Sequence, residues 1–122
     1  MPRPVHFEIP ADNVDRAANF YRQVFDWELQ KWEGPMEYWL VNTGPSDQPG
    51  INGGLMPRQN PGQLVVNTID VPDIDEFQAK IEKNGGEIVV PKMAVPGVGW
   101  TLYFKDTEGN IFSLMQEDLS AK

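Results

Sequence analysis

The feature that most constrains the fold is an order of predicted elements that occurs twice along the chain. Each time, a strand is followed by a helix and then by three more strands. Val14 aligns with Ile74 at an offset of 60 residues, 74 minus 14, and Gly54 aligns with Ser113 at an offset of 59 residues, 113 minus 54. The sequence therefore predicts an α+β protein built from two βαβββ modules.

The first module is predicted from its hydrophobic patterns and turn residues. Val5–Ile9 alternates apolar and polar residues and stops at Pro10, as a half-buried strand does. A helix follows, with Asp12 or Asn13 as its N-cap and apolar side chains at three- and four-residue spacings up to Phe25. The three strands expected after this helix are Trp27–Glu33, Met36–Asn42 and Ile51–Pro57.

The second module repeats this order after a linker rich in proline and glycine. A strand is expected at Leu64–Ile69, and Asp73 is expected to cap a helix that stops at Asn84. We expect one domain over residues 1–122, with module one at about 5–57, the linker at 58–62 and module two at about 63–118. The three strands that follow the second helix are expected at Glu87–Val90, Val98–Lys105 and Asn110–Gln116.

Each predicted module has one helix, and one helix covers only one face of a sheet. The other face must be covered in some other way. The simplest arrangement has eight strands curled around a common concave cavity, with one helix per module packed on the outside. A cavity lined by strands is a typical place for a small-molecule ligand.

Composition excludes several functional classes. The chain has 18 acidic against 10 basic residues, a net charge of −8, and no basic run, which argues against a nucleic-acid partner. It has no cysteine, and its single histidine excludes zinc sites that need two or three histidines from one chain. There is no apolar run of membrane-spanning length, and the opening residues lack a signal-peptide core. We therefore expect a cytoplasmic protein without membrane partners.

The candidate catalytic residues are His6, which is the single histidine, and Glu8. They are two positions apart in a predicted strand, so their side chains lie on one face. They could share a proton as a general acid/base pair, or bind a weak divalent metal with water in the remaining positions. The alternative is an ordinary hydrogen bond at a strand edge.

Aromatic and methionine side chains are the other candidates for ligand contact. Flat rings and thioethers suit an apolar or aromatic ligand, and cation–π attraction could hold a cationic one. Core packing is the alternative role for each of these side chains. The aromatic candidates in or near strands include Trp32, Tyr38 and Tyr103, and those that we select as ligand-binding residues are Trp39, Met56, Trp100 and Met115.

Two short motifs carry a resemblance to a known family. Residues 20–27, FYRQVFDW, and residues 104–110, FKDTEGN, resemble the motifs F-Y-x-x-x-F-G-W and F-x-D-P-D-G-N of the vicinal oxygen chelate superfamily. This superfamily contains glyoxalase I, extradiol dioxygenases and the bleomycin- and fosfomycin-resistance proteins. The resemblance covers Val5–Glu117. In physical terms both motifs are packing signals: Phe20, Tyr21 and Phe25 are expected to fill the contact between helix and sheet.

The resemblance also implies where metal ligands would stand. In metal-dependent members they come from the first and last strands of each module, which here are the positions of His6, Gly54 or its neighbour Leu55, Val66 and Ser113. Only His6 is a good ligand, and three or four protein donors are needed to hold a divalent metal tightly. We therefore expect no intact metal site and no cofactor, with weak divalent metal at His6 as the alternative, and we assign Ser113 to ligand binding.

Two functions remain open at this stage. The first is a small-molecule-binding protein that encloses an apolar or aromatic ligand without turnover. The second is a glyoxalase-like lyase or isomerase, or a dioxygenase-related enzyme, that uses His6 and Glu8 with a weakly bound metal. We also expect a homodimer, in which modules could be exchanged between chains.

Overall fold

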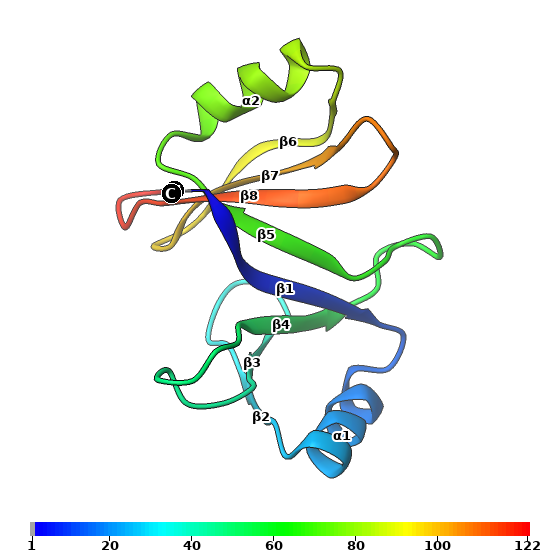
Figure 1. The fold of residues 1–122 in the computed structure, drawn as a ribbon. Coiled ribbons are helices and arrows are strands. Elements are labelled where there is room, and N and C mark those ends of the chain that lie inside the picture. The colour runs from blue at the N-terminus through cyan, green and yellow to red at the C-terminus, as the bar shows by residue number, and fades with distance from the viewer. Residues whose placement is uncertain (1) are drawn as a thin grey trace. The chain divides into compact units, whose positions relative to one another are not determined.

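Within residues 2–122, the part of the chain described by the computed structural model, there are eight strands and two helices (Figure 1). The chain divides into two compact units: residues 6–65 form one, and residues 2–5 together with residues 66–122 form the other. Each βαβββ series is present in full. The predicted α+β class and the two modules are confirmed.

The first module has its strands in the order β2-β3-β4-β1. β1 and β4 pair in parallel, with His6 opposite Asn52 and Glu8 opposite Gly54, whereas β2, β3 and β4 pair antiparallel. The first and last strands of the module are therefore neighbours in space. The elements are β1 (Arg3–Ala11), α1 (Val14–Phe25), β2 (Glu28–Lys31), β3 (Trp39–Asn42) and β4 (Asn52–Pro57).

The second module follows the same plan, in the order β5-β8-β7-β6. β5 and β8 pair in parallel, with Thr68 opposite Ser113, and the other pairs are antiparallel. The elements are β5 (Val66–Asp70), α2 (Ile74–Lys83), β6 (Glu87–Val95), β7 (Gly99–Lys105) and β8 (Ile111–Glu117).

Each helix begins at a side chain that caps its free backbone N–H groups. Asn13 caps α1, because its Oδ1 accepts from the backbone nitrogen of Arg16 at 3.0 Å. Asp12, the other candidate, instead pairs with Arg58 at 2.9 Å. Asp73 caps α2, as predicted, and its Oδ1 accepts from the backbone nitrogens of Asp75 and Glu76.

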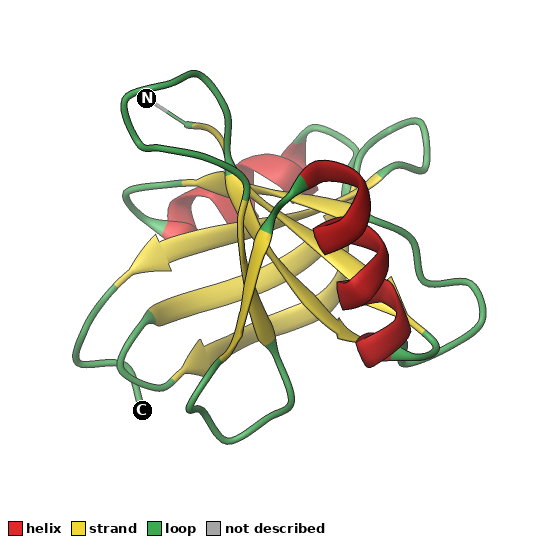
Figure 2. Ribbon diagram, turned by 90° about the horizontal axis from the view of Figure 1, so that it is seen from below, coloured by secondary structure: helices red, strands yellow, loops and turns green. Residues whose placement is uncertain are grey.

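Each helix covers one face of the strands of its own module (Figures 1 and 2). In the first module Ala18 of α1 is fully buried against a core that includes Val41 and Leu55. In the second module Ile74 of α2 packs with Leu102 and Leu114. Strand residues alternate between faces, so the residues beside these core positions point away from the helix.

The expectation that Phe20 and Phe25 fill the contact between helix and sheet is wrong. Their exposed fractions are 56% and 54%, and both lie at the margin of the core. Tyr21 makes the contact instead, because Asp26 adopts a left-handed conformation that returns the chain and stacks the Trp27 ring on Tyr21 at a centroid distance of 5.2 Å. Phe25 stacks on Trp27 from the outside.

The second motif forms the turn that was expected between β7 and β8. The Oδ1 of Asp106 accepts from the backbone nitrogens of Glu108 and Asn110, and Gly109 has the positive φ, 85°, that the turn requires. The hydrogen bonds from Asn110 lower the pKa of Asp106 more than any other interaction does. The motif is therefore structural.

The aromatic contacts give a prediction about stability. Trp27→Ala should lower the free energy of unfolding by about 2 to 3 kcal/mol, because its ring packs against Tyr21 and the core. Phe20→Ala, the matched control, should cost about 0.5 kcal/mol or less, because an exposed side chain loses little packing. Urea unfolding measures both. Equal losses in the two variants would contradict this assignment of the core.

Candidate functional site

The candidate site lies on the face of the first module that α1 does not cover. Phe7 and Ile9 of β1 pack against the core of this module. His6 and Glu8 alternate with them and therefore project together from the opposite face. The sequence predicted that they share a face but not which face it is. Both side chains are partly buried.

A hydrogen-bonded chain joins these two residues through Tyr38. The Nε2 of His6 lies 2.7 Å from the Tyr38 hydroxyl oxygen, and the hydroxyl donates to Oε2 of Glu8 at 3.3 Å. With the hydroxyl proton directed at Glu8, the first bond requires His6 to donate from Nε2. The direction of donation is then from the imidazole through the phenol to the carboxylate.

Tyr38 reaches this position from the connection between β2 and β3. The backbone nitrogen of Trp32 donates to the carbonyl oxygen of Tyr38 at 2.8 Å, which closes the hairpin. The Trp32 ring then packs edge-on against the Tyr38 ring at 6.1 Å between centroids. Gly54 of β4 makes room for the phenol, because a Cβ at this position would overlap the Tyr38 hydroxyl and ring.

Burial sets the protonation state of His6. The loss of solvent lowers the pKa of the imidazole below its ordinary value of 6.5, and the nearby negative charge of Glu8 offsets part of this effect. At neutral pH His6 is therefore an uncharged imidazole. An uncharged imidazole that donates from Nε2 has Nδ1 available to accept a proton.

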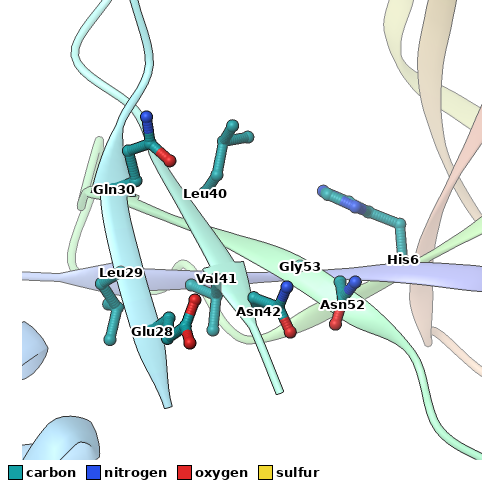
Figure 3. Close-up of a pocket in the computed structure, with 9 residues that line it drawn as sticks. All are labelled: His6, Glu28, Leu29, Gln30, Leu40, Val41, Asn42, Asn52 and Gly53. Atoms are coloured by element: carbon teal, nitrogen blue, oxygen red, sulfur yellow. The ribbon is translucent and has the colours of Figure 1, made fainter. Parts of the chain in front are cut away.

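A pocket of about 580 Å³ adjoins His6. This volume lies in the range of ordinary small-molecule sites. His6, Gln30 and Leu40 project to one side of the strands, whereas Leu29 and Val41 project to the other (Figure 3). The remaining lining residues are Glu28, Asn42, Asn52 and Gly53.

The two asparagines of the lining also hold the loop between β3 and β4. Oδ1 of Asn42 accepts from the backbone nitrogen of Gly44 at 3.0 Å, and Oδ1 of Asn52 accepts from that of Thr43 at 2.9 Å. These bonds fix both amide groups and leave their Nδ2 donors to serve a ligand. The lining therefore combines amide donors and the carboxylate of Glu28 with the apolar side chain of Leu40, and it contains no lysine or arginine.

The residues of this site do not fit a tightly held divalent metal. Among residues 2–122 no group of three or more histidine, aspartate, glutamate or cysteine side chains is arranged to hold a metal ion. His6 and Glu8 supply two donors, and Gly54 supplies no third because glycine has no side chain; Tyr38 fills the space that a side chain there would occupy. The other two positions implied by the family resemblance hold Val66, which cannot coordinate, and Ser113.

Two of the predicted ligand-binding residues belong to the first module. Met56 lies on the His6 face of β4, because it alternates with the buried core residue Leu55. Trp39 lies on the opposite face, where it packs against the core and has the guanidinium of Arg22 5.8 Å from its ring centroid. The structure therefore brings Met56, but not Trp39, to the face that carries His6.

The other three predicted ligand-binding residues lie in the second module. Ser113 is buried and its hydroxyl lies 2.6 Å from that of Thr68, and Met115 is on the same face of β8. Trp100 packs against the core on the helix side, and its Nε1 donates to Asp118 at 3.0 Å. The ammonium group of Lys92 lies 4.8 Å from the Trp100 ring centroid, on the same side of the sheet.

Reasoning from the sequence did not identify most of the pocket. It treated Tyr38 as one aromatic candidate among five and did not connect it with His6. The sequence did contain a signal for this contact, since a glycine inside a strand often marks the close approach of another group. Gly54 is such a glycine, and the phenol of Tyr38 packs against it. The pocket residues that were not singled out are Glu28, Leu29, Gln30, Leu40, Val41, Asn42, Asn52 and Gly53.

Comparison with known proteins shows the family of this chain. The profile of the Glyoxalase/Bleomycin resistance protein/Dioxygenase superfamily matches residues 3–114. A glyoxylase-like domain-containing protein from Didymella fabae is 30% identical, and the match covers 88% of each chain. The chain therefore belongs to the glyoxalase/bleomycin resistance/dioxygenase superfamily.

Solved structures of distant relatives have the same fold. A variant of the methylmalonyl-CoA epimerase from Streptomyces coelicolor, in complex with 2-nitronate-propionyl-CoA, has a TM-score of 0.70 and 17% identity, with 98% of this chain and 97% of that chain covered. A hypothetical protein from Bacillus halodurans has a TM-score of 0.72 and 14% identity, with coverage of 99% and 98%. No helix within residues 2–122 has the length and apolarity needed to cross a membrane.

The hydrogen-bonded chain gives a prediction about pH. Glu8→Gln should lower the pKa of His6 further, because the charge that stabilises the imidazolium is lost while burial remains. The pKa is measured by following the ring protons of His6 by NMR against pH. Glu33→Gln, which changes an exposed carboxylate in the same module, should leave the titration unchanged. A rise in the pKa of His6 in Glu8→Gln would contradict the assignment.

Proposed function

We propose that the protein binds a small molecule in the pocket of the first module, beside His6. One observation supports the proposal most directly: His6 both lines a pocket of about 580 Å³ and belongs to the hydrogen-bonded chain of His6, Tyr38 and Glu8. Fixed polar groups beside a pocket are the usual means of orienting a ligand. Binding at this site needs no metal ion.

The lining supports a ligand with an aromatic or apolar part and an uncharged or cationic polar group. Leu40 provides apolar surface, and the amides of Asn42 and Asn52 provide fixed donors. The carboxylate of Glu28 favours a cation and repels an anion. No positive side chain of the lining offsets that repulsion.

A glyoxalase-like lyase or isomerase is the second candidate function. The specific observation in its favour is the hydrogen-bonded chain, through which a proton taken up at one end could be passed to the other. Enzymes named as epimerases have the same fold, which makes an isomerase chemically plausible at this site. In this reaction His6 would accept a proton from the substrate and Glu8 would stabilise the resulting imidazolium through Tyr38.

The binding proposal is tested with three aromatic probes of similar size and different charge: benzamide, benzylamine and benzoate. Each is titrated into ¹⁵N-labelled protein, and the backbone amide shifts are followed by NMR. Benzamide and benzylamine should shift the amides of the pocket lining in a saturable manner, and benzoate should bind at least tenfold more weakly, for about 1.4 kcal/mol of repulsion. Shifts confined to other parts of the chain would overturn the proposed site.

Two substitutions with matched controls locate the binding. Leu40→Ala should weaken benzamide binding about fivefold, for about 1 kcal/mol of lost apolar contact. Leu64→Ala, which shortens an exposed leucine outside the pocket, should have no effect. Glu28→Gln should strengthen benzoate binding, whereas Glu33→Gln should not. Binding that changes equally in both members of either pair would argue against this pocket.

The enzyme candidate is tested by turnover of the hemithioacetal of methylglyoxal and glutathione, without added metal. Turnover that is lost in both His6→Ala and Glu8→Gln would support a lyase or isomerase at this site. Absence of turnover in the unmodified protein, with benzamide binding retained, would leave the binding function as the better account.

A further inference from the structure

The ring of Tyr38 occupies the space in which a side chain at position 54 would stand. Gly54 is buried and lies opposite Glu8 in the β1–β4 register, on the same face as His6. A Cβ at this position would overlap the hydroxyl oxygen and the Cζ and Cε1 atoms of Tyr38. Positions 6 and 8 of β1 and position 54 of β4 therefore lie on one face. The phenol of Tyr38 fills the space that a side chain at position 54 would occupy.

The same phenol forms a hydrogen bond with Nε2 of His6, the atom through which His6 could bind a metal ion. Nε2 of His6 lies 2.7 Å from the Tyr38 hydroxyl, and the two rings are nearly parallel, with an interplanar angle of 10°. A metal ion bound at Nε2 would have to displace this hydroxyl, because a histidine nitrogen that binds a metal has no proton to donate. The same hydroxyl donates to Oε2 of Glu8.

The position of Tyr38 is itself supported by packing. The Trp32 ring lies edge-on against it, and Gly34 leaves room for Trp32, because a Cβ at position 34 would overlap that ring. Two glycines and two aromatic rings therefore form one packed layer beside His6. A side chain held in this way retains its position when a ligand exchanges.

We propose that Tyr38 takes the place of a metal ion at this site: its ring excludes a third ligand at position 54, and its hydroxyl holds His6 and Glu8 in register. Tyr38 is thus a positioning residue that acts through His6. The inference rests on the proposed function only in taking His6 as the centre of the binding site. It predicts that the site becomes a metal site when the phenol is removed and a third donor is supplied.

The test is a zinc titration, followed by isothermal calorimetry, of the unmodified protein and of a double variant, Tyr38→Ala with Gly54→Glu. The double variant combines the imidazole of His6 with the carboxylates of Glu8 and the new residue, which is the minimum donor set for a held zinc ion. It should bind one zinc ion per chain on the order of 100-fold more tightly than the unmodified protein, the size of effect that supporting groups have at metal sites. His6→Ala in the double variant should abolish this gain.

Two further measurements do not depend on whether the double variant folds. In the unmodified protein, ¹⁵N shifts of the His6 ring should show Nε2 protonated, and zinc should leave them unchanged. In Tyr38→Phe, which keeps the ring but lacks the hydroxyl, Nε2 should lose this hydrogen-bond signature. Residue 54 is still glycine in that variant and supplies no third donor, so its zinc affinity should stay within about threefold of that of the unmodified protein, or about 0.6 kcal/mol.

The results separate this inference from the proposed function. Tight zinc binding at His6 in the unmodified protein, or His6 ring shifts unaffected by Tyr38→Phe, would overturn the role of Tyr38, and benzamide binding in the pocket would still support the function. Failure of every probe to bind the pocket, with zinc binding only in the double variant, would overturn the function and support the role of Tyr38.

Discussion

A single helix can cover only one face of a four-stranded module, and the rest of the first module follows from this constraint. α1 packs over the face that presents Phe7, Val41 and Leu55. Since side chains alternate along a strand, His6 and Glu8 must then emerge on the other face. A shift of β1 by one residue would exchange the two sets, burying the imidazole in the core and exposing the phenylalanine. The hydrophobic core therefore determines where the polar site lies.

Membership of the superfamily leaves the chemistry of this chain open, because the fold hosts several activities. The residues of the first module point to a site built on hydrogen bonds. Its imidazole is kept uncharged by burial, and its neighbours are a phenol and a carboxylate. The direction of donation in such a network can orient a ligand, in addition to the charge selectivity that Glu28 gives the pocket.

Much of the fold was predictable from the sequence, because its signals are local. The repeated element order, the Asp73 cap and the Asp106 turn all depend on residues close together in the chain. The position of His6 and Glu8 on one face needed only strand alternation. The contact with Tyr38 depends on the connection between β2 and β3, whose path no local sequence pattern specifies. The one sequence signal for this contact was Gly54, the strand glycine against which the ring packs. The exposure of Phe20 was missed because helical spacing alone does not tell how wide the covered sheet is.

The parallel pairing of β1 with β4 has a consequence for synthesis of the protein. His6 leaves the ribosome before its strand partner Asn52, which follows only after the helix and two further strands have been made. Contacts between distant parts of a chain form late, because the loop between them must first be closed. A nascent chain that ends in the loop between β3 and β4 could thus form α1 and the β2–β3 hairpin but not the pocket. Ligand binding to ribosome-attached chains would report the moment at which β4 inserts between β1 and β3.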